Sequence, residues 1–201
     1  MIDNAVKIIS QTDEAAIVGG YGVIFGGVDL EGETFSADTN YMLDLVPTKL
    51  AMYDHGQQKA VDVPIGTIPN ENIEVDEKGL FVKAELDRSR EYVDQVLDLV
   101  KKGILGWSSG TVGHLARRDE GKITQWPIIE FSLTPTPAEP RTLGVERIKS
   151  LAAVYPDLEA LLPKTEQDTV TKGATDQGVL PITITSDTSL PKATIERCSK
   201  Q

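Results

Sequence analysis

The chain has few of the residues that build disulfides, metal sites or membrane spans. Its 201 residues include one cysteine, Cys198, and two histidines, His55 and His114. A single cysteine excludes an internal disulfide and fits a reducing compartment. Two histidines and one cysteine in the tail provide no zinc-ligand spacing, and no spacing of carboxylates indicates another metal. Since no apolar run approaches the roughly 20 residues that span a bilayer, we expect no metal, no other cofactor and no membrane partner.

Basic charge is also scarce. The chain has 20 Lys and Arg against 31 Asp and Glu, a net charge of −11, which argues against binding to phosphate backbones and so against a nucleic-acid partner. No glycine-rich segment matches the phosphate-loop or dinucleotide pattern. The first residues, Met1 to Asn4, lack the basic flank and apolar stretch of a signal peptide. We therefore expect an intracellular protein.

Length and composition predict one domain followed by a tail. Hydrophobic residues make up 40% of the chain, enough for a real core, and we place the domain at residues 1–163. Residues 164–201 are rich in Thr, Ser, Gly, Pro and charged side chains with little to bury, so we expect most of this tail to be disordered. Within it, Val179 to Ile184 suits addition to an exposed strand edge.

Strand-like segments dominate the first half, and one helix stands out. Segments rich in β-branched and apolar residues, bounded by Gly, Asp and Asn, predict strands at 6–9, 15–25, 63–68 and 80–86, with turns at 29–33 and 76–79. A helix is predicted after Ser89 as its cap and before Gly103 as its C′ residue. Its apolar face repeats at helical spacing in Val93, Val96, Leu97 and Val100. One or two short helices are expected over 145–162, broken near Pro156 and stopped by Pro163.

A long hairpin is predicted next. Strands at 104–118 and 123–133 flank Asp119-Glu120-Gly121, which suits a three-residue loop with glycine in the left-handed position. If this loop sets the register, Arg118 opposes Lys122.

The same register brings two polar positions together. It pairs Glu130 with Gly110, and Ser108 shares a sheet face with Gly110 because side chains alternate along a strand. Ser108 and Glu130 would then be diagonal neighbours, roughly 7–8 Å apart. A one-residue slip, which Pro127 could introduce through a bulge, would place them on opposite faces.

The candidate chemistry lies in three residues, His55, Ser108 and Glu130. A serine hydroxyl needs a neighbouring base to become a useful nucleophile, and an imidazole oriented by a carboxylate is the usual base. Glu130 stands among apolar residues, and a buried carboxylate needs a partner such as a protonatable imidazole. The trio predicts a serine hydrolase.

Each member also has an ordinary interpretation. His55 taken alone fits a histidine of a surface loop, and Ser108 a small polar residue of a Gly-rich strand. Glu130 fits a solvent-facing carboxylate or a partner for Arg117 or Arg118. The hydrolase hypothesis therefore requires that the three side chains lie close together in the folded protein.

Two further residues compete for these roles. Ser109 is a rival nucleophile on the opposite sheet face. His114 lies six residues from Ser108, roughly 20 Å away in an extended strand at about 3.3 Å per residue. We therefore leave His114 out of the triad.

Six short motifs follow one another over roughly residues 17 to 142. They are a Gly-rich strand with Asp29-Leu30-Glu31-Gly32-Glu33, a loop histidine followed by Pro64-Ile65-Gly66, Gly79-Leu80-Phe81-Val82, a helix ending in Lys102-Gly103-Ile104-Leu105, a Ser-x-Gly strand, and Glu130-Phe131-Ser132-Leu133 running into Pro137-Ala138-Glu139-Pro140. In this order they resemble the prohead (capsid maturation) serine proteases of tailed bacteriophages, the HK97-type group, which is related in fold to the herpesvirus assemblins.

The resemblance implies a fold and a set of roles. The fold would be α+β, mainly an antiparallel β-barrel surrounded by a few helices. His55 matches the general base, Ser108 the nucleophile of Ser-x-Gly, and Glu130 the third member. The chain has Ser109 where many relatives carry an aliphatic residue, which keeps the choice between Ser108 and Ser109 open. The backbone N–H groups of Ser109 and Gly110 are candidates for an oxyanion hole.

The resemblance also implies a biological setting. A serine endopeptidase of this kind acts inside the viral procapsid, in the host cytoplasm, on scaffold and major capsid protein extensions and often on itself. The tail would then be a self-cleavage substrate or a tether, and a homodimer or higher oligomer stays open. The alternative is a non-catalytic β-barrel module that binds capsid or scaffold, for which the three candidate side chains would be scattered. The cleavage-site preference and the activation trigger do not follow from the sequence.

Overall fold

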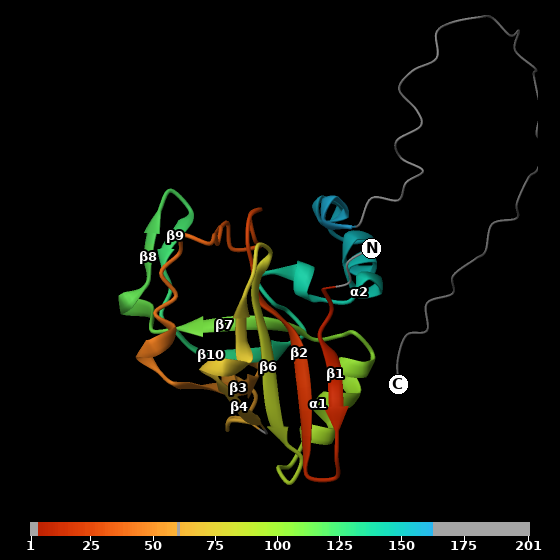
Figure 1. Ribbon diagram of the computed structural model, residues 1–201. Coiled ribbons are helices and arrows are strands. Elements are labelled where there is room, and N and C mark those ends of the chain that lie inside the picture. Colours follow the sequence, from red (N-terminus) through yellow and green to blue (C-terminus); the bar gives the residue numbers. More distant parts are fainter. Residues whose placement is uncertain (1–3, 60, 163–201) are drawn as a thin grey trace, which may run out of the picture. The chain divides into compact units, whose positions relative to one another are not determined.

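A curled, mostly antiparallel sheet organises residues 4–59 and 61–162, which are the residues that the computed structural model describes (Figure 1). Eight strands share the sheet, in the order β1-β2-β6-β4-β3-β10-β7, with β5 paired to β6. All these pairs are antiparallel except β3 with β10. β7 and β10 run across the direction of β1, β2 and β6 (Figure 1), so the sheet curls into a half-barrel in which β2 contacts β7. The predicted α+β class is confirmed.

The elements have the following bounds. The strands are β1 (Lys7–Gln11), β2 (Ala15–Ile24), β3 (Thr48–Tyr53), β4 (Gly66–Pro69), β5 (Ile73–Val75), β6 (Gly79–Asp87), β7 (Gly106–Thr111), β8 (Arg117–Asp119), β9 (Lys122–Gln125) and β10 (Ile128–Thr134). The helices are α1 (Val93–Lys101) and α2 (Val145–Ala152), and the 3-10 turns are η1 (Leu43–Leu45), η2 (Asp54–Gly56), η3 (Asn70–Asn72), η4 (Gly113–Leu115), η5 (Pro140–Thr142) and η6 (Pro156–Leu161).

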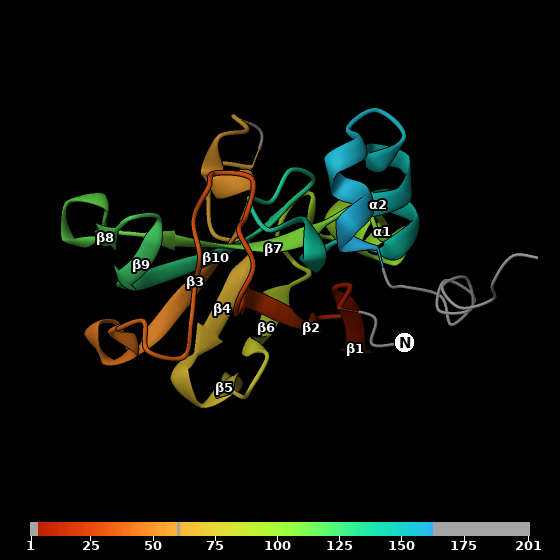
Figure 2. The ribbon, with the colours of Figure 1, turned by 90° about the horizontal axis from the view of Figure 1, so that it is seen from above.

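The core follows from strand alternation. On β6 every second residue is fully buried, and the buried set is Leu80, Val82, Ala84 and Leu86. On β10 the apolar side chains of Phe131 and Leu133 are fully buried and belong to the same core, which also contains Trp107 of β7. Both helices lie on one side of the sheet, away from the β8–β9 ribbon (Figure 2).

Helix α1 confirms the predicted apolar face and C-terminus but not the predicted start. Its four apolar residues at helical spacing are all buried. At its end, the N–H of Gly103 (φ 65°) donates to Val100 O and that of Ile104 donates to Leu99 O, which is a Schellman motif. The helix begins at Val93, not directly after Ser89, because the Ser89 hydroxyl donates to the Asp87 carboxylate at 2.6 Å instead of capping the helix.

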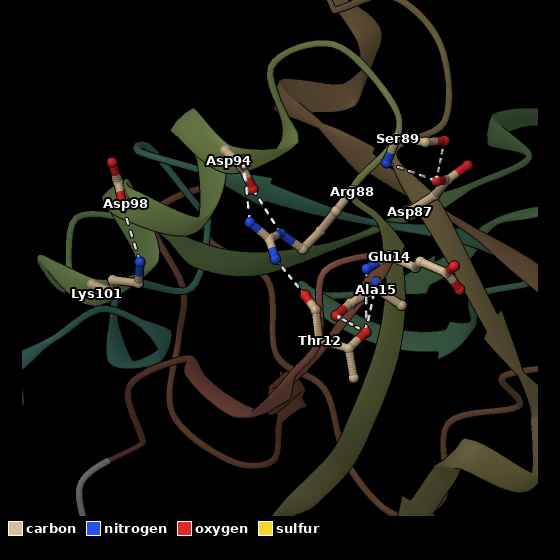
Figure 3. Close-up of polar contacts among 9 residues, drawn as sticks. All are labelled: Thr12, Glu14, Ala15, Asp87, Arg88, Ser89, Asp94, Asp98 and Lys101. Carbon is tan, nitrogen blue, oxygen red and sulfur yellow. Dashed lines mark hydrogen bonds and ion pairs between the residues drawn. The ribbon is translucent and has the colours of Figure 1, made fainter.

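Arg88 fixes the beginning of α1 (Figure 3). Its Nε donates to Asp94 Oδ1 at 2.8 Å, and its Nη1 donates to the carbonyl of Thr12 in the β1–β2 turn. Asp94 lies in the first turn of α1, where a carboxylate also favours the positive end of the helix dipole. One guanidinium therefore ties the helix to the sheet.

The predicted hairpin is present in a broken form. η4 separates β7 from β8, and residues 126–127 separate β9 from β10. The turn has two residues, Glu120 and Gly121, both left-handed with φ of 46° and 82°, so Arg118 opposes Ile123 instead of Lys122. The predicted three-residue loop was wrong, because two left-handed residues form the tighter turn that matches strand twist.

The register at the candidate site is nevertheless the predicted one. Glu130 pairs with Gly110, and Ser132 pairs with Ser108. A register shift does occur beside Pro127, between Ile128 and Glu130. It lies outside the segment that carries the candidate residues, so their shared face is preserved.

The remaining segments agree with the sequence in part. The short helices α2 and η6 occur where they were expected, whereas the strand predicted at 63–68 begins only at Gly66. The predicted turn at 29–33 is a hydrogen-bonded loop without paired strands on both sides. Pro163 and the segment Val179 to Ile184 lie outside the described residues. Among the helices of residues 4–162, none is long and apolar enough to cross a bilayer.

Candidate active site

His55 reaches the sheet through an unusual turn. It follows β3, which runs parallel to β10 with Tyr53 opposite Leu133. An extended continuation of β3 would carry residue 55 about five residues beyond Glu130, or roughly 16 Å at 3.3 Å per residue. Instead, the three residues of η2 have left-handed φ values of 47°, 54° and 67°. This turn reverses the chain and returns the imidazole to Glu130.

The imidazole contacts the carboxylate directly. His55 Nδ1 lies 2.6 Å from Glu130 Oε1, with side-chain exposures of 30% and 13%. The hydrogen bond with Glu130 raises the pKa of His55 above its ordinary 6.5, burial opposes the rise, and the negative charges of Glu130, Asp54 and Glu31 add to it. A carboxylate at Nδ1 favours the tautomer that carries its proton there, which leaves Nε2 free to accept a proton.

Gly110 makes room for this carboxylate. A Cβ at position 110 would overlap Oε1, Cδ and Cγ of Glu130. The Glu130 side chain therefore lies across the neighbouring strand at a residue that has no side chain. This steric requirement explains the glycine of the Ser-x-Gly motif.

Ser132 and Thr134 support the same turn, and sequence reasoning did not assign them. Ser132 Oγ accepts the His55 backbone N–H at 3.0 Å and donates to Glu130 Oε2 at 2.8 Å. Thr134 Oγ1 donates to Asp54 Oδ1 at 2.8 Å. The sequence did contain a pattern that could have identified them. Glu130, Ser132 and Thr134 alternate with apolar residues, which places three polar side chains on one face of an apolar strand.

Ser108 lies on the face that carries the imidazole and the carboxylate. It is opposite Ser132 and two residues from Gly110, so it faces the same side as Glu130. His55 and Ser108 line one cavity of about 230 Å³. Among the described residues, no hydrogen bond joins Ser108 Oγ to His55. The structure thus brings His55 and Glu130 into contact and places Ser108 at the same cavity.

Ser109 has different surroundings. It pairs with the buried Phe131 and so faces the core side of the sheet, where its Oγ accepts from Trp126 Nε1 at 3.1 Å. Ser109 and Gly110 also line the cavity. β7 ends the path of strands, so within the described residues one of its edges has no strand partner, and residues 22–24 of β2 line the cavity too.

The other predicted alternatives have separate positions. His114 is exposed in η4 and does not line the cavity. Arg118 pairs with Glu33, and Arg117 donates to the carbonyls of His114 and Ala116, so neither arginine is the partner of Glu130.

Carboxylates form much of the remaining cavity wall. Glu33 and Glu139 are each paired with an arginine, Arg118 and Arg141. Burial raises the pKa of Asp29, which also lines the cavity, and the charges of Glu33 and Glu139 act in the same direction, while backbone hydrogen bonds oppose the shift. Within the part of the chain that the structure describes, no group of three or more His, Cys, Asp or Glu is placed to hold a metal ion.

A comparison of the sequence with protein families finds a known group. The family described as Caudovirus prohead serine protease matches residues 4–155. The chain belongs to this family. It is accordingly a serine protease of capsid maturation, as the order of motifs had suggested. No curated protein and no solved structure matches the chain.

Replacement of Gly110 by alanine tests the packing of the carboxylate. In Gly110→Ala, the new methyl group overlaps the Glu130 carboxylate, so we expect the hydrogen bond to His55 to break and the pKa of His55 to fall toward 6.5. NMR titration of the His55 ring protons measures this change. Gly113→Ala is the matched control, because a Cβ there meets no atom within 4 Å. An unchanged His55 titration in folded Gly110→Ala would contradict the steric role.

Proposed function

We propose that this protease uses His55, Ser108 and Glu130 to cleave extensions of scaffold and capsid proteins during head maturation. The observation that carries the proposal is the 2.6 Å contact between His55 and Glu130 beside a cavity that Ser108 also lines. The three residues come from distant parts of the chain, and the non-catalytic alternative would have scattered them. No observation favours that alternative.

In the proposed mechanism each residue has one task. His55 Nε2 accepts the Ser108 proton as the hydroxyl oxygen attacks the peptide carbonyl, and it then donates that proton to the leaving amine. Glu130 keeps the Nδ1 proton in place and stabilises the imidazolium. A water molecule, activated in the same way, hydrolyses the acyl-enzyme. Binding of substrate in the cavity would bring Ser108 Oγ and Nε2 within hydrogen-bond reach.

Main-chain groups of β7 would complete the site. Ser109 and Gly110 are adjacent to the proposed nucleophile and line the cavity. Successive N–H groups of a strand point in opposite directions, so we assign to the oxyanion hole the N–H group of this pair that points away from β10. One edge of β7 has no strand partner among residues 4–59 and 61–162, and this edge suits an extended peptide, which can bind to exposed main-chain groups.

The family supplies the setting for the proposal. Scaffold and major capsid protein are the substrates we propose, inside the procapsid in the host cytoplasm, with neither a nucleic acid nor a membrane as partner. We also propose that the enzyme cleaves itself in residues 164–201, downstream of the domain that we place at 1–163. A homodimer or higher oligomer is compatible with the proposal.

Replacement of the two neighbouring serines tests the nucleophile. Ser108→Ala removes the attacking oxygen, and we expect cleavage of scaffold protein to fall by about 10⁴-fold or more with the melting temperature unchanged. Ser109→Ala is the matched control and should keep activity within about tenfold, because its hydroxyl faces Trp126. Both rates are measured by gel-based cleavage of purified scaffold. Active Ser108→Ala together with inactive Ser109→Ala would overturn the assignment.

Self-cleavage is tested by the intact mass of the purified protein. Wild-type protein held at high concentration should lose mass from its C-terminal region, because residues 164–201 have the polar composition, with little to bury, that is typical of good protease substrates. Ser108→Ala should keep the full mass under the same conditions. Equal loss in both proteins would assign the cleavage to another protease.

The pH dependence of cleavage tests the base. Since His55 must be neutral to accept a proton and its pKa is raised above 6.5, kcat/KM should rise with pH and level off only above 6.5. Glu130→Gln removes the largest cause of the raised pKa, so the midpoint should move to lower pH. The plateau should also drop, by about 10²–10⁴-fold, because the tautomer is no longer held. A midpoint that does not move in Glu130→Gln would show that another group controls the profile.

A further inference from the structure

Strand β10 presents three polar side chains to the turn that carries the histidine. Glu130 contacts the His55 ring, Ser132 the His55 backbone, and Thr134 the Asp54 carboxylate. Residues two apart on a strand face the same side. The three side chains therefore contact two consecutive residues, Asp54 and His55, of a turn in which every residue has a left-handed backbone conformation.

Ser132 differs from its neighbours because its hydroxyl joins both catalytic partners. It accepts the His55 N–H at 3.0 Å and donates its own proton to Glu130 Oε2 at 2.8 Å. One hydroxyl offers one donor and two acceptor lone pairs, so both bonds form without conflict. The second carboxylate oxygen is thus occupied, and Oε1 is left for the imidazole at 2.6 Å.

We propose that Ser132 is a positioning residue of the protease, which sets the distance and orientation between His55 and Glu130. The proposal rests on the proposed function, in which His55 is the base. Ser132 is fully buried and directly opposite Ser108, so it neither meets substrate nor competes as nucleophile. Thr134 supports it by holding Asp54, the first residue of the turn.

The charges around His55 explain why such positioning matters. Carboxylates approach it from three elements: Glu130 on β10, Asp54 in its own turn, and Glu31 in the loop after β2. Only Glu130 makes a hydrogen bond to the ring. By fixing the His55 backbone and one oxygen of Glu130, Ser132 selects this pair over the two others. An imidazole turned toward another carboxylate would present Nε2 in a different direction.

The test removes the hydroxyl and follows His55 directly. In Ser132→Ala we expect the pKa of His55 to fall toward 6.5, measured by NMR in the Ser108→Ala background so that activity is not needed. His114, which is exposed and does not line the cavity, is the internal reference. In the background with Ser108 intact, kcat for scaffold-peptide cleavage should fall by about 10²-fold, as expected for a misplaced catalytic group, with KM nearly unchanged.

Two variants separate positioning from simple loss of a buried hydroxyl. Thr39→Val removes a hydroxyl that is buried and bonded to Ile123 O, and it should lower the melting temperature while the His55 titration and kcat stay the same. Ser132→Thr keeps the hydroxyl and should retain the wild-type titration. If Ser132→Ala does not fold, Thr134→Val tests the same turn through Asp54 and should lower kcat without changing KM.

The outcomes distinguish this inference from the proposed function. Folded Ser132→Ala with unchanged His55 titration and unchanged kcat would overturn the positioning role and leave the protease mechanism standing. A shifted His55 titration in a protein whose wild type cleaves no scaffold would support the contacts of Ser132 and refute the proposed function. Loss of kcat in Thr39→Val equal to that in Ser132→Ala would also overturn the inference, because any buried hydroxyl would then have the same effect.

Discussion

The contact between His55 and Glu130 requires the chain to reverse its direction at the end of β3. β3 and β10 run parallel, yet His55, two residues after the end of β3, contacts Glu130 near the start of β10. Parallel pairing of Tyr53 with Leu133 directs the chain away from Glu130, and only a sharp reversal can return it. Because L-residues avoid left-handed backbone, the reversal at Asp54 and His55 persists only where surrounding contacts hold it. The geometry of the proposed catalytic site and the local backbone strain are therefore one feature of the fold.

The energies of this arrangement balance closely. Asp54 and His55 each cost about 1–2 kcal/mol in the left-handed region, and Gly56 costs little there. The neutral hydrogen bond from His55 N–H to Ser132 contributes about 0.5–1.5 kcal/mol. The turn also makes two hydrogen bonds that involve a carboxylate, one between the His55 ring and Glu130 and one between Thr134 and Asp54. Each of these contributes about 1.5–3 kcal/mol. The contacts therefore exceed the strain by a few kcal/mol at most. A turn so narrowly held responds to the loss of any single contact, and this explains why three side chains of one strand converge on it.

The sequence predicted the local features of the site better than the distant ones. The pairing of Gly110 with Glu130 was predicted correctly although the predicted loop was one residue too long, because register shifts in the β8–β9 ribbon and between Ile128 and Glu130 compensate for the shorter turn. Phe131 and Leu133 must face the core, so a slip by one residue would expose both. β3 was not predicted as a strand. Its parallel pairing with β10 could not be predicted either, since alternation identifies a strand and not its partner about 80 residues away. The left-handed turn had only a weak signal, the tolerance of Asp and His for this conformation.

Two of the six motifs that carried the family resemblance lie side by side on one face of the sheet. Ser108 and Gly110 on β7 stand opposite Ser132 and Glu130 on β10, so Ser-x-Gly and Glu-x-Ser meet as two cross-strand pairs on a single face. In one pair the glycine admits the carboxylate, and in the other the serine of β10 positions that carboxylate beside the proposed nucleophile. In each motif the two residues are separated by one residue, because every second side chain of a strand lies on the same face. Because the pairs share a face, neither motif can shift by one residue without moving the carboxylate away from the serine. A sequence rule that names Ser108 and Glu130 alone therefore omits the two small residues that allow them to lie on the same surface.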